Sequence, residues 1–359
     1  MRRIKSIDAF RGLCIFYMII GHAVIWWTKE SHKEIVLILR RLTEILGATG
    51  FLFVSGISVV LALRKKMEKV KADLKYSMND LFKEHYARSL LFLVLALMYN
   101  AITLIWFMGL SGIWSWYILF TITICLLIAY PLIKLQKITR ISLAFFIIFF
   151  TYPLFGGLEN LIARDPESGW TILYYILFNP IQEYPILPYF AFFSIGTVVG
   201  EIFYEIYSIK QDDLKDILVK KKIVRNFIIY GGLLITTAVL CSIFIFDDPI
   251  SFIIRTSFTW MLYGIGLDLI LIGFLTYLHE FILTPEWRYR FLFYFSYYSL
   301  TLYLGHNVIA FIFWERLDIV TCIAIAILVA IGFWYLTRFL YNKSGPKYSV
   351  KYLISKRVS

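Results

Sequence analysis

Residues 6–27 read SIDAFRGLCIFYMIIGHAVIWW, an apolar stretch long enough to cross a membrane. The stretch nevertheless contains Asp8, Arg11 and His22. An ionisable side chain near the bilayer centre costs about 3 kcal/mol, so these residues are candidates for function. Arg11 and His22 are eleven positions apart, which is about 20° beyond three helical turns and roughly 16 Å along the axis. They therefore share one helix face, with a cation at one end and a proton acceptor at the other.

The composition predicts an all-α polytopic membrane protein. Of 359 residues, 60% are hydrophobic and 17% are charged, and the mean hydropathy is +0.74. A soluble domain of this size cannot bury so much apolar surface. The net charge of +12 lies in loops between apolar segments, where it serves as a topology signal, and no basic soluble domain is present to bind nucleic acid.

We expect one integral-membrane domain, residues 1–359, with ten transmembrane helices and both termini in the cytoplasm. The predicted spans are residues 8–27, 45–63, 88–108, 112–133, 141–155, 186–206, 226–246, 253–278, 291–314 and 319–341. Lysine and arginine concentrate at the termini and in alternate loops, as the positive-inside rule requires. These basic groups are Arg3 and Lys5; Arg64, Lys65, Lys66, Lys69, Lys71 and Lys83; Lys134, Lys137 and Arg140; Lys210, Lys215, Lys220, Lys221, Lys222 and Arg225; and Lys343, Lys347, Lys351, Lys356 and Arg357.

The first loop, with Lys29, Lys33, Arg40 and Arg41, is the exception to this alternation. Residues 67–87 are expected to form an amphipathic interfacial helix, and the apolar segment 170–178 a cap over an external site. The first span is expected to stay uncleaved in the cytoplasmic membrane, because no small-x-small cleavage site follows it.

The intramembrane histidines are the candidates for acid–base chemistry. His306 lies about fifteen residues into a span that runs in the same direction as the first, so His306 and Asn307 reach a depth similar to that of His22. Two histidines and an amide at one level could form a general-base site. The alternative is that either histidine only bonds to a neighbouring helix.

Charged residues suggest where ligands bind. Arg11, assisted by Arg88 at the same side of the membrane, could bind phosphate, although Asp8 and Arg11 could also pair with each other. Arg255 could bind an anionic acceptor on the outer side. Asp268 lies in mid-span. The glycines of the segment 47–56 are expected to let span two pack closely on span one. The cysteines lie within apolar spans and, like the rest of the chain, show no metal-ligand spacing.

The sequence resembles integral-membrane acyltransferases, above all the prokaryotic heparan-α-glucosaminide N-acetyltransferase-like group, with the acyltransferase type 3 family next. The resemblance rests on SIDAFRGL (6–13), on the arginine–histidine spacing of Arg11 and His22, on GFLFVSGIS from residue 50, on YPILPYFAFFSIGTVVG (184–200) and on YYSLTLYLGHNV (297–308). It covers essentially the whole chain.

The resemblance implies transfer of an acetyl or other acyl group from cytoplasmic acyl-CoA to an extracytoplasmic acceptor, such as a sugar amine or hydroxyl of a glycan. His22 would take the essential histidine's role, with His306 and Asn307 beside it, and Arg11 with Asp8 and Arg88 would hold the donor. Eukaryotic glucosamine enzymes carry their functional histidine in the loop beyond the first span, where this chain has His32. His32 therefore remains an alternative to His22 and a candidate for acceptor binding.

A secondary transporter that uses His22, His306 and Asp268 as a proton or substrate relay is the competing interpretation. The acceptor, the acyl chain, N- or O-transfer and a homodimeric state are left open by the sequence.

Overall fold

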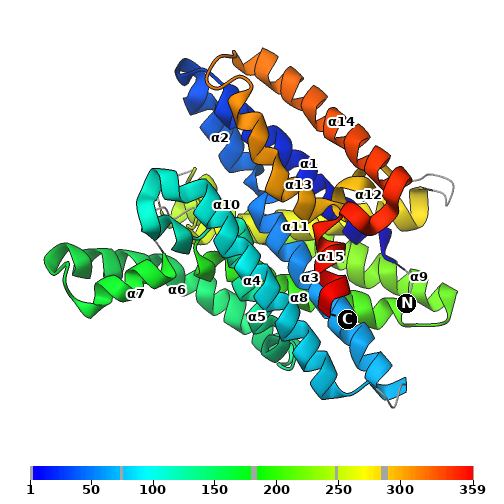
Figure 1. Ribbon diagram of the computed structural model, residues 1–359. Helices are drawn as coiled ribbons and strands as arrows, with labels where there is room; N and C mark the ends of the chain where they lie inside the picture. The colour runs from blue at the N-terminus through cyan, green and yellow to red at the C-terminus, as the bar shows by residue number, and fades with distance from the viewer. Residues whose placement is uncertain (1–2, 73–75, 179–183, 247–249, 284–289, 359) are drawn as a thin grey trace. The chain divides into compact units, whose positions relative to one another are not determined.

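The computed structural model describes residues 3–72, 76–178, 184–246, 250–283 and 290–358, and these residues are almost entirely helical (Figure 1). The chain divides into two compact units. The smaller unit combines residues 2–51 with residues 270–359, and the larger unit contains residues 52–269. Helices α3 and α11 each contribute to both units. The absence of strands among the described residues agrees with the predicted all-α class.

The smaller unit brings the two ends of the chain together around its first helix, α1. Its elements are α1 (Lys5–Trp27), η1 (Glu30–His32), α2 (Lys33–Thr43), η2 (Glu44–Leu46), η6 (Leu278–Ile282), α12 (Arg290–Tyr297), α13 (Ser299–Gly305), η7 (His306–Phe311), α14 (Ile319–Ser344), η8 (Gly345–Tyr348) and α15 (Val350–Val358). Helix α1 packs against α12, α13 and α14, and Figure 1 shows α14 running beside it.

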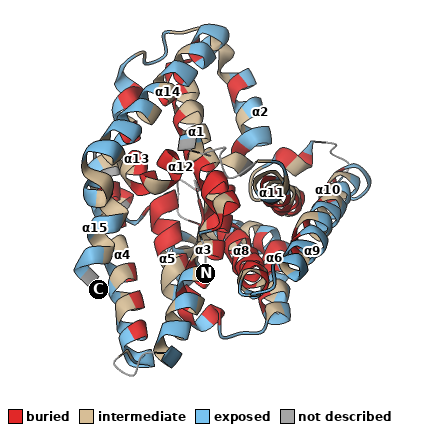
Figure 2. Ribbon diagram, turned by 90° about the vertical axis from the view of Figure 1, so that its right-hand side faces the viewer, coloured by how far each residue is buried: buried red, intermediate tan, exposed pale blue. Residues whose placement is uncertain are grey.

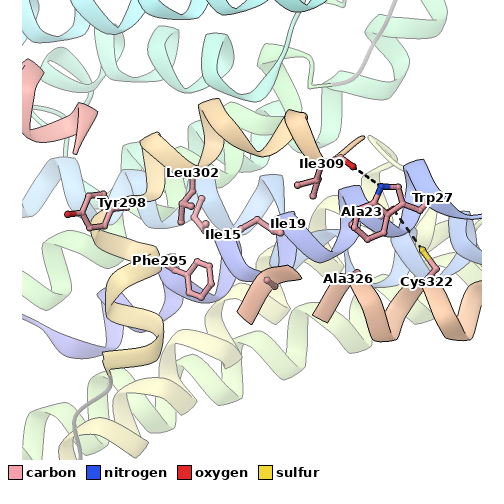
Figure 3. Close-up of a cluster of buried hydrophobic side chains, with 11 residues drawn as sticks. Ile15, Ile19, Ala23, Trp27, Phe295, Tyr298, Leu302, Ile309, Cys322 and Ala326 are labelled. Carbon is pink, nitrogen blue, oxygen red and sulfur yellow. Dashed lines mark hydrogen bonds between the residues drawn. The ribbon is translucent and has the colours of Figure 1, made fainter. Parts of the chain in front are cut away.

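A buried apolar cluster holds these helices together (Figure 3). Its members share near-complete burial and come from α1, α12, α13, η7 and α14: Ile15, Ile19, Ala23, Trp27, Phe295, Tyr298, Leu302, Ile309, Cys322, Ala326 and Ala330. At its α12 end, a Cβ on Gly12 would lie 2.0 Å from the carbonyl oxygen of Leu292. Only glycine permits this approach, so α12 lies directly on the backbone of α1.

The larger unit supplies most of the remaining long helices. Its elements are α3 (Ala48–Ala72), α4 (Met78–Met108), η3 (Gly109–Trp114), α5 (Ile118–Leu132), α6 (Lys137–Arg164), α7 (Gly169–Leu177), α8 (Ile186–Tyr207), α9 (Asp212–Leu218), η4 (Val219–Arg225), α10 (Asn226–Phe244), η5 (Ser251–Ile253) and α11 (Phe258–Tyr277). Helix α8 is the buried centre of this unit, with 16 of its residues buried, and it is largely red in Figure 2.

The glycine prediction was wrong about the partner of Gly56. A Cβ on Gly56 would lie 2.3 Å from the carbonyl oxygen of Phe193, and one on Gly196 would lie 2.1 Å from that of Phe53. These glycines therefore pack α3 on α8, whereas Gly47 lies against Tyr17 of α1. The physical reason for the glycines, close backbone approach, is the predicted one.

Eight helices in the described part of the chain are long and apolar enough to cross a membrane. Two of the ten predicted spans do not correspond to one long helix in the structure. The region 112–133 contains the shorter helix α5, and the region 291–314 is divided among α12, α13 and η7. Residues 141–155 belong to the longer helix α6. Of the predicted interfacial helix over residues 67–87, residues 67–72 belong to α3 and residues 78–87 to α4, and residues 73–75 lie outside the described residues.

The outward faces of the long helices are apolar. Ile102 of α4, Phe149 of α6 and Val320 of α14 are 71%, 64% and 74% exposed, respectively. Side chains of this kind are stable at a helix surface when hydrocarbon surrounds them. The chain is therefore a multi-pass membrane protein.

Candidate functional site

His22 and His306 lie together in the smaller unit. Their ring centroids are 5.0 Å apart, and the rings meet edge to face. His22 is half-buried on α1, and His306, at the first position of η7, is only 2% exposed. The two histidines come from opposite ends of the sequence, and both belong to the predicted site.

The hydrogen bonding of His306 determines which ring nitrogen can accept a proton. Its Nδ1 lies 2.6 Å from the carbonyl oxygen of Tyr303. A carbonyl oxygen only accepts, so Nδ1 carries the hydrogen and Nε2 of the neutral ring carries a lone pair. This Nε2 is buried and has no hydrogen-bond partner among the described residues. His306 can therefore act as a base or as a hydrogen-bond acceptor through Nε2.

Trp26 completes the histidine pair, although the sequence analysis did not include it among the site residues. Its ring is 4.9 Å from that of His22 and stacks on that of His306 at 5.8 Å, measured between centroids. Trp26 is four positions after His22, so both project from one face of α1. That spacing in the sequence could have predicted that Trp26 lies beside His22. We call His22, Trp26 and His306 the histidine cluster.

Main-chain and side-chain hydrogen bonds fix the position of η7 relative to α1. The indole Nε1 of Trp27 donates to the carbonyl oxygen of Ile309 at 2.8 Å, drawn as a dashed line in Figure 3. The amide of Glu315 donates to the carbonyl oxygen of Trp26 at 2.9 Å. The ammonium of Lys33 contacts the carboxylate of Glu315 at 2.5 Å. These bonds hold His306 beside His22, because η7 begins at His306.

Arg11 and Asp8 form a polar network in the first turns of α1. The guanidinium Nη1 of Arg11 is 3.7 Å from Oδ1 of Asp8 and 3.4 Å from Oγ of Ser296 on α12. Ser296 donates to the same Asp8 oxygen at 3.1 Å, and Arg3 also pairs with Asp8. The alternative of an Asp8–Arg11 pair is thus realised. Two guanidinium groups thus contact the one carboxylate of Asp8.

Arg40 of α2 is a second residue that the sequence analysis did not connect with the site. It interacts electrostatically with both His22 and Tyr17, and the hydroxyl of Tyr17 bonds to Thr43 of α2. Arg40 is one of the basic residues that made the first loop the exception in the charge pattern. A cation on α2 contributes to the field at His22.

The other predicted site residues are Asn307 and His32 of the smaller unit and Arg88 and Arg255 of the larger unit. Asn307 follows His306 in η7 and is half-buried. His32, in η1, makes no ring contact with His22 or His306 among the described side chains. Arg88 lies on α4 of the larger unit, over the ring of Phe92, and Arg255 lies over the ring of Tyr184 in the same unit.

The histidine cluster can transfer protons, and it lies on the helix whose other end carries the Arg11 network. An imidazole with an open lone pair can take a proton from an amine or hydroxyl. A cationic network about 16 Å along the same helix suits the phosphates of an elongated donor. The described residues contain no cluster of three or more histidine, cysteine or acidic side chains of the kind that holds a metal ion.

Comparison with known proteins assigns the family. No curated protein sequence matches the chain. A family model described as "Heparan-alpha-glucosaminide N-acetyltransferase, catalytic" matches residues 3–235, which include α1 and its arginine and histidine. The match covers more than half of the 359 residues. Together with the apolar helices, it identifies the chain as a membrane acetyltransferase of the heparan-α-glucosaminide N-acetyltransferase catalytic family.

Proposed function

We propose that this protein transfers an acetyl group from cytoplasmic acetyl-CoA to the amine or hydroxyl of a glycan-like acceptor on the other side of the cytoplasmic membrane. The observation that carries the proposal is the contact between His22, which lies within the matched residues 3–235, and His306, which lies beyond them. An intramembrane histidine pair is expensive and needs a functional reason.

In the proposed mechanism, His22 removes the proton from the acceptor as the acceptor attacks the thioester carbonyl. The carbon–sulfur bond breaks, CoA leaves as a thiolate, and the proton held by His22 returns to the sulfur. A transient acetyl-histidine on His22 is the two-step version of the same transfer. His306 contributes a fixed acceptor atom, Nε2, which can orient the substrate N–H or O–H group.

Arg11 and Arg3 are proposed to attract the donor phosphates, with Asp8 and Ser296 holding Arg11 in place. On the charge pattern of the loops, this end of α1 faces the cytoplasm and the histidine cluster lies toward the outer side. Arg255 and His32 are proposed acceptor contacts, Arg88 a second donor contact, and Asn307 a neighbour of the transferred group.

Sided proteoliposomes test the proposal. Labelled acetyl-CoA is supplied at the cytoplasmic face only, and glucosamine is enclosed at the other face. We expect labelled N-acetylglucosamine to accumulate inside for the wild type and for His32→Ala, but not for His22→Ala. Equal product from His22→Ala would remove the catalytic role of His22. If no label is transferred to glucosamine, a set of sugars that offer only hydroxyl groups is tested as acceptors. Absence of transfer to these sugars as well would contradict the proposed acetyltransferase function.

A transporter is the second candidate because of Asp268 on α11. The side chain is fully buried, and neither carboxyl oxygen has a hydrogen-bond partner among the described residues. Such a carboxyl group can carry a proton. Flux of a solute or proton in the same vesicles without acetyl-CoA would favour transport, whereas flux that requires acetyl-CoA would favour the enzyme.

A further inference from the structure

The larger unit contains a buried group of charges that the proposed transfer does not use. The carboxylate of Glu201 on α8 contacts two guanidinium groups at once. Its Oε1 is 2.7 Å from Nη2 of Arg64 on α3, and its Oε2 is 3.2 Å from Nη2 of Arg140 on α6. The Arg140 and Glu201 side chains are 1% and 9% exposed, and that of Arg64 is 30% exposed. We call these three residues the arginine pair and its bridging glutamate.

This group holds two guanidinium groups and one carboxylate, and the carboxylate of Glu205, which is paired with Lys137, adds a further attractive charge at Arg140. Two guanidinium groups face a single buried carboxylate, and both oxygens of that carboxylate are already used. Three guanidinium nitrogens are buried without a hydrogen-bond partner among the described residues: Nε of Arg64, and Nε and Nη1 of Arg140. Buried charged donors without acceptors cost free energy, so an acceptor other than the described residues is expected here.

If this group only linked helices, it would not need a second arginine. A neighbouring pair on the same two helices, Lys137 and Glu205, joins α6 to α8 with one cation and one carboxylate at 2.8 Å. That exposed ion pair also joins these two helices and needs only one cation for its carboxylate. The second arginine, Arg64, adds charge to a buried place where one more apolar residue would pack without cost.

The surroundings favour an anion. Arg140 lies in the first turn of α6, which begins at Lys137, so the positive end of a 28-residue helix adds to its charge. Arginine side chains present planar pairs of N–H groups that match phosphate oxygens. The partly exposed side chain of Arg64 gives the group an open side.

We propose that Arg64 and Arg140, bridged by Glu201, bind a phosphate ester at this end of the larger unit. The phosphate comes either from an anionic phospholipid headgroup or from a phosphorylated cosubstrate such as CoA. On the loop charges, α3 ends and α6 begins on the cytoplasmic side, where both sources occur. The site requires neither the histidine cluster nor acetyl transfer.

Thermal unfolding of the full-length protein in an uncharged detergent tests this site, since a ligand that binds only the folded state raises Tm. The probes are inorganic phosphate, phosphatidylglycerol in mixed micelles, CoA and dephospho-CoA. Sodium chloride at matched ionic strength and phosphatidylcholine are the controls. Stabilisation by phosphatidylglycerol alone identifies the lipid source, and stronger stabilisation by CoA than by dephospho-CoA identifies the cosubstrate. Either result supports the site.

The variants separate binding from a structural clamp. Arg64→Gln leaves the Arg140–Glu201 pair intact and is expected to weaken the apparent affinity for the stabilising probe by about tenfold or more. Lys137→Gln, the matched control, is expected to change it by less than about twofold. Glu201→Gln keeps both arginines and removes their counter-charge, so phosphate is expected to raise its Tm more than that of the wild type.

An equal response of Arg64→Gln and the wild type to every probe would overturn the proposal and leave a structural ion-pair clamp. The absence of any stabilisation beyond that of sodium chloride would do the same. Failure of acetyl transfer alone, with probe binding that still depends on Arg64, would reject the proposed function and leave this site intact.

Discussion

At the scale of single residues, the account depends on a few expensive side chains in apolar helices. His306 has its Nδ1 hydrogen committed to the carbonyl oxygen of Tyr303, which leaves Nε2 as the open atom. Trp26 covers both imidazoles. The sequence predicted that His22 and His306 lie within membrane spans, where ionisable groups are energetically unfavourable, and at a similar depth. It could not show the tautomer of His306, because that depends on a backbone oxygen three residues away.

His32 provides the sharpest residue-level comparison, since the family resemblance left it as an alternative to His22. We expect His32→Ala to change kcat for acetyl transfer by less than about threefold and to act only on KM for the acceptor, because His32 makes no ring contact with the histidine cluster among the described side chains. Steady-state kinetics of purified protein measure this. A loss as large as that of His22→Ala would move the catalytic role to the loop.

Arg11 distinguishes donor binding from a purely structural pair. Because the Arg11 guanidinium is a proposed contact of the donor phosphates, we expect Arg11→Ala to raise KM for acetyl-CoA by about tenfold or more, with little change in kcat. Initial rates against acetyl-CoA concentration give both constants. Ser296→Ala, which keeps both arginines, is the control and should leave KM nearly unchanged. An unaltered KM for Arg11→Ala would reduce the network to a fold contact.

At the scale of elements, periodicity and length predicted the long helices well and the breaks poorly. The segment 291–314 carries no proline and has only Gly305 to signal an interruption. Helix α12 nevertheless ends at Tyr297, and a separate helix, α13, begins at Ser299. The Tyr298 hydroxyl donates to the carbonyl oxygen of Gly345 at 2.7 Å, a tertiary bond that a local pattern does not contain. Helix α2, with the sequence KEIVLILRRLT, was taken as loop because charges flank its apolar core IVLIL.

Helix packing makes Gly12 the most sensitive glycine of the smaller unit. Gly12→Ala would place a methyl group against the Leu292 carbonyl, so we expect a loss of about 1–3 kcal/mol in the free energy of unfolding. Gly332→Ala in α14 is the matched control, because no atom lies within 4 Å of its Cβ position. We expect it to be neutral or stabilising by about 1 kcal/mol. Thermal unfolding in detergent measures both, and equal behaviour would contradict the close packing of α1 on α12.

At the scale of the whole molecule, composition alone predicted a helical membrane protein, and the apolar helices and the family match confirm it. The sequence did not reveal that residues 2–51 and 270–359 form one unit, since contacts between distant segments leave no local trace. The sidedness of the chain remains a prediction from the loop charges.

Cysteine labelling tests that sidedness. In a background that replaces the half-buried Cys241 by alanine, we expect an impermeant maleimide to label Glu30→Cys and Glu167→Cys in intact cells. Lys356→Cys and Asp213→Cys should react only after the membrane is opened. All four positions are exposed, so access depends on the side of the membrane. Labelling of Lys356→Cys in intact cells would place the C-terminus outside the cell and contradict acetyl transfer from the cytoplasm to the outer side.

The most direct test of the account measures thioester consumption by the purified full chain, as CoA released from acetyl-CoA in the presence of acceptor. The account predicts that His22→Ala and His306→Ala each lower kcat/KM by at least about 100-fold, while helix content and Tm stay close to those of the wild type. Wild-type turnover by either variant would contradict the claim that the two histidines, in contact across α1 and η7, carry the transfer.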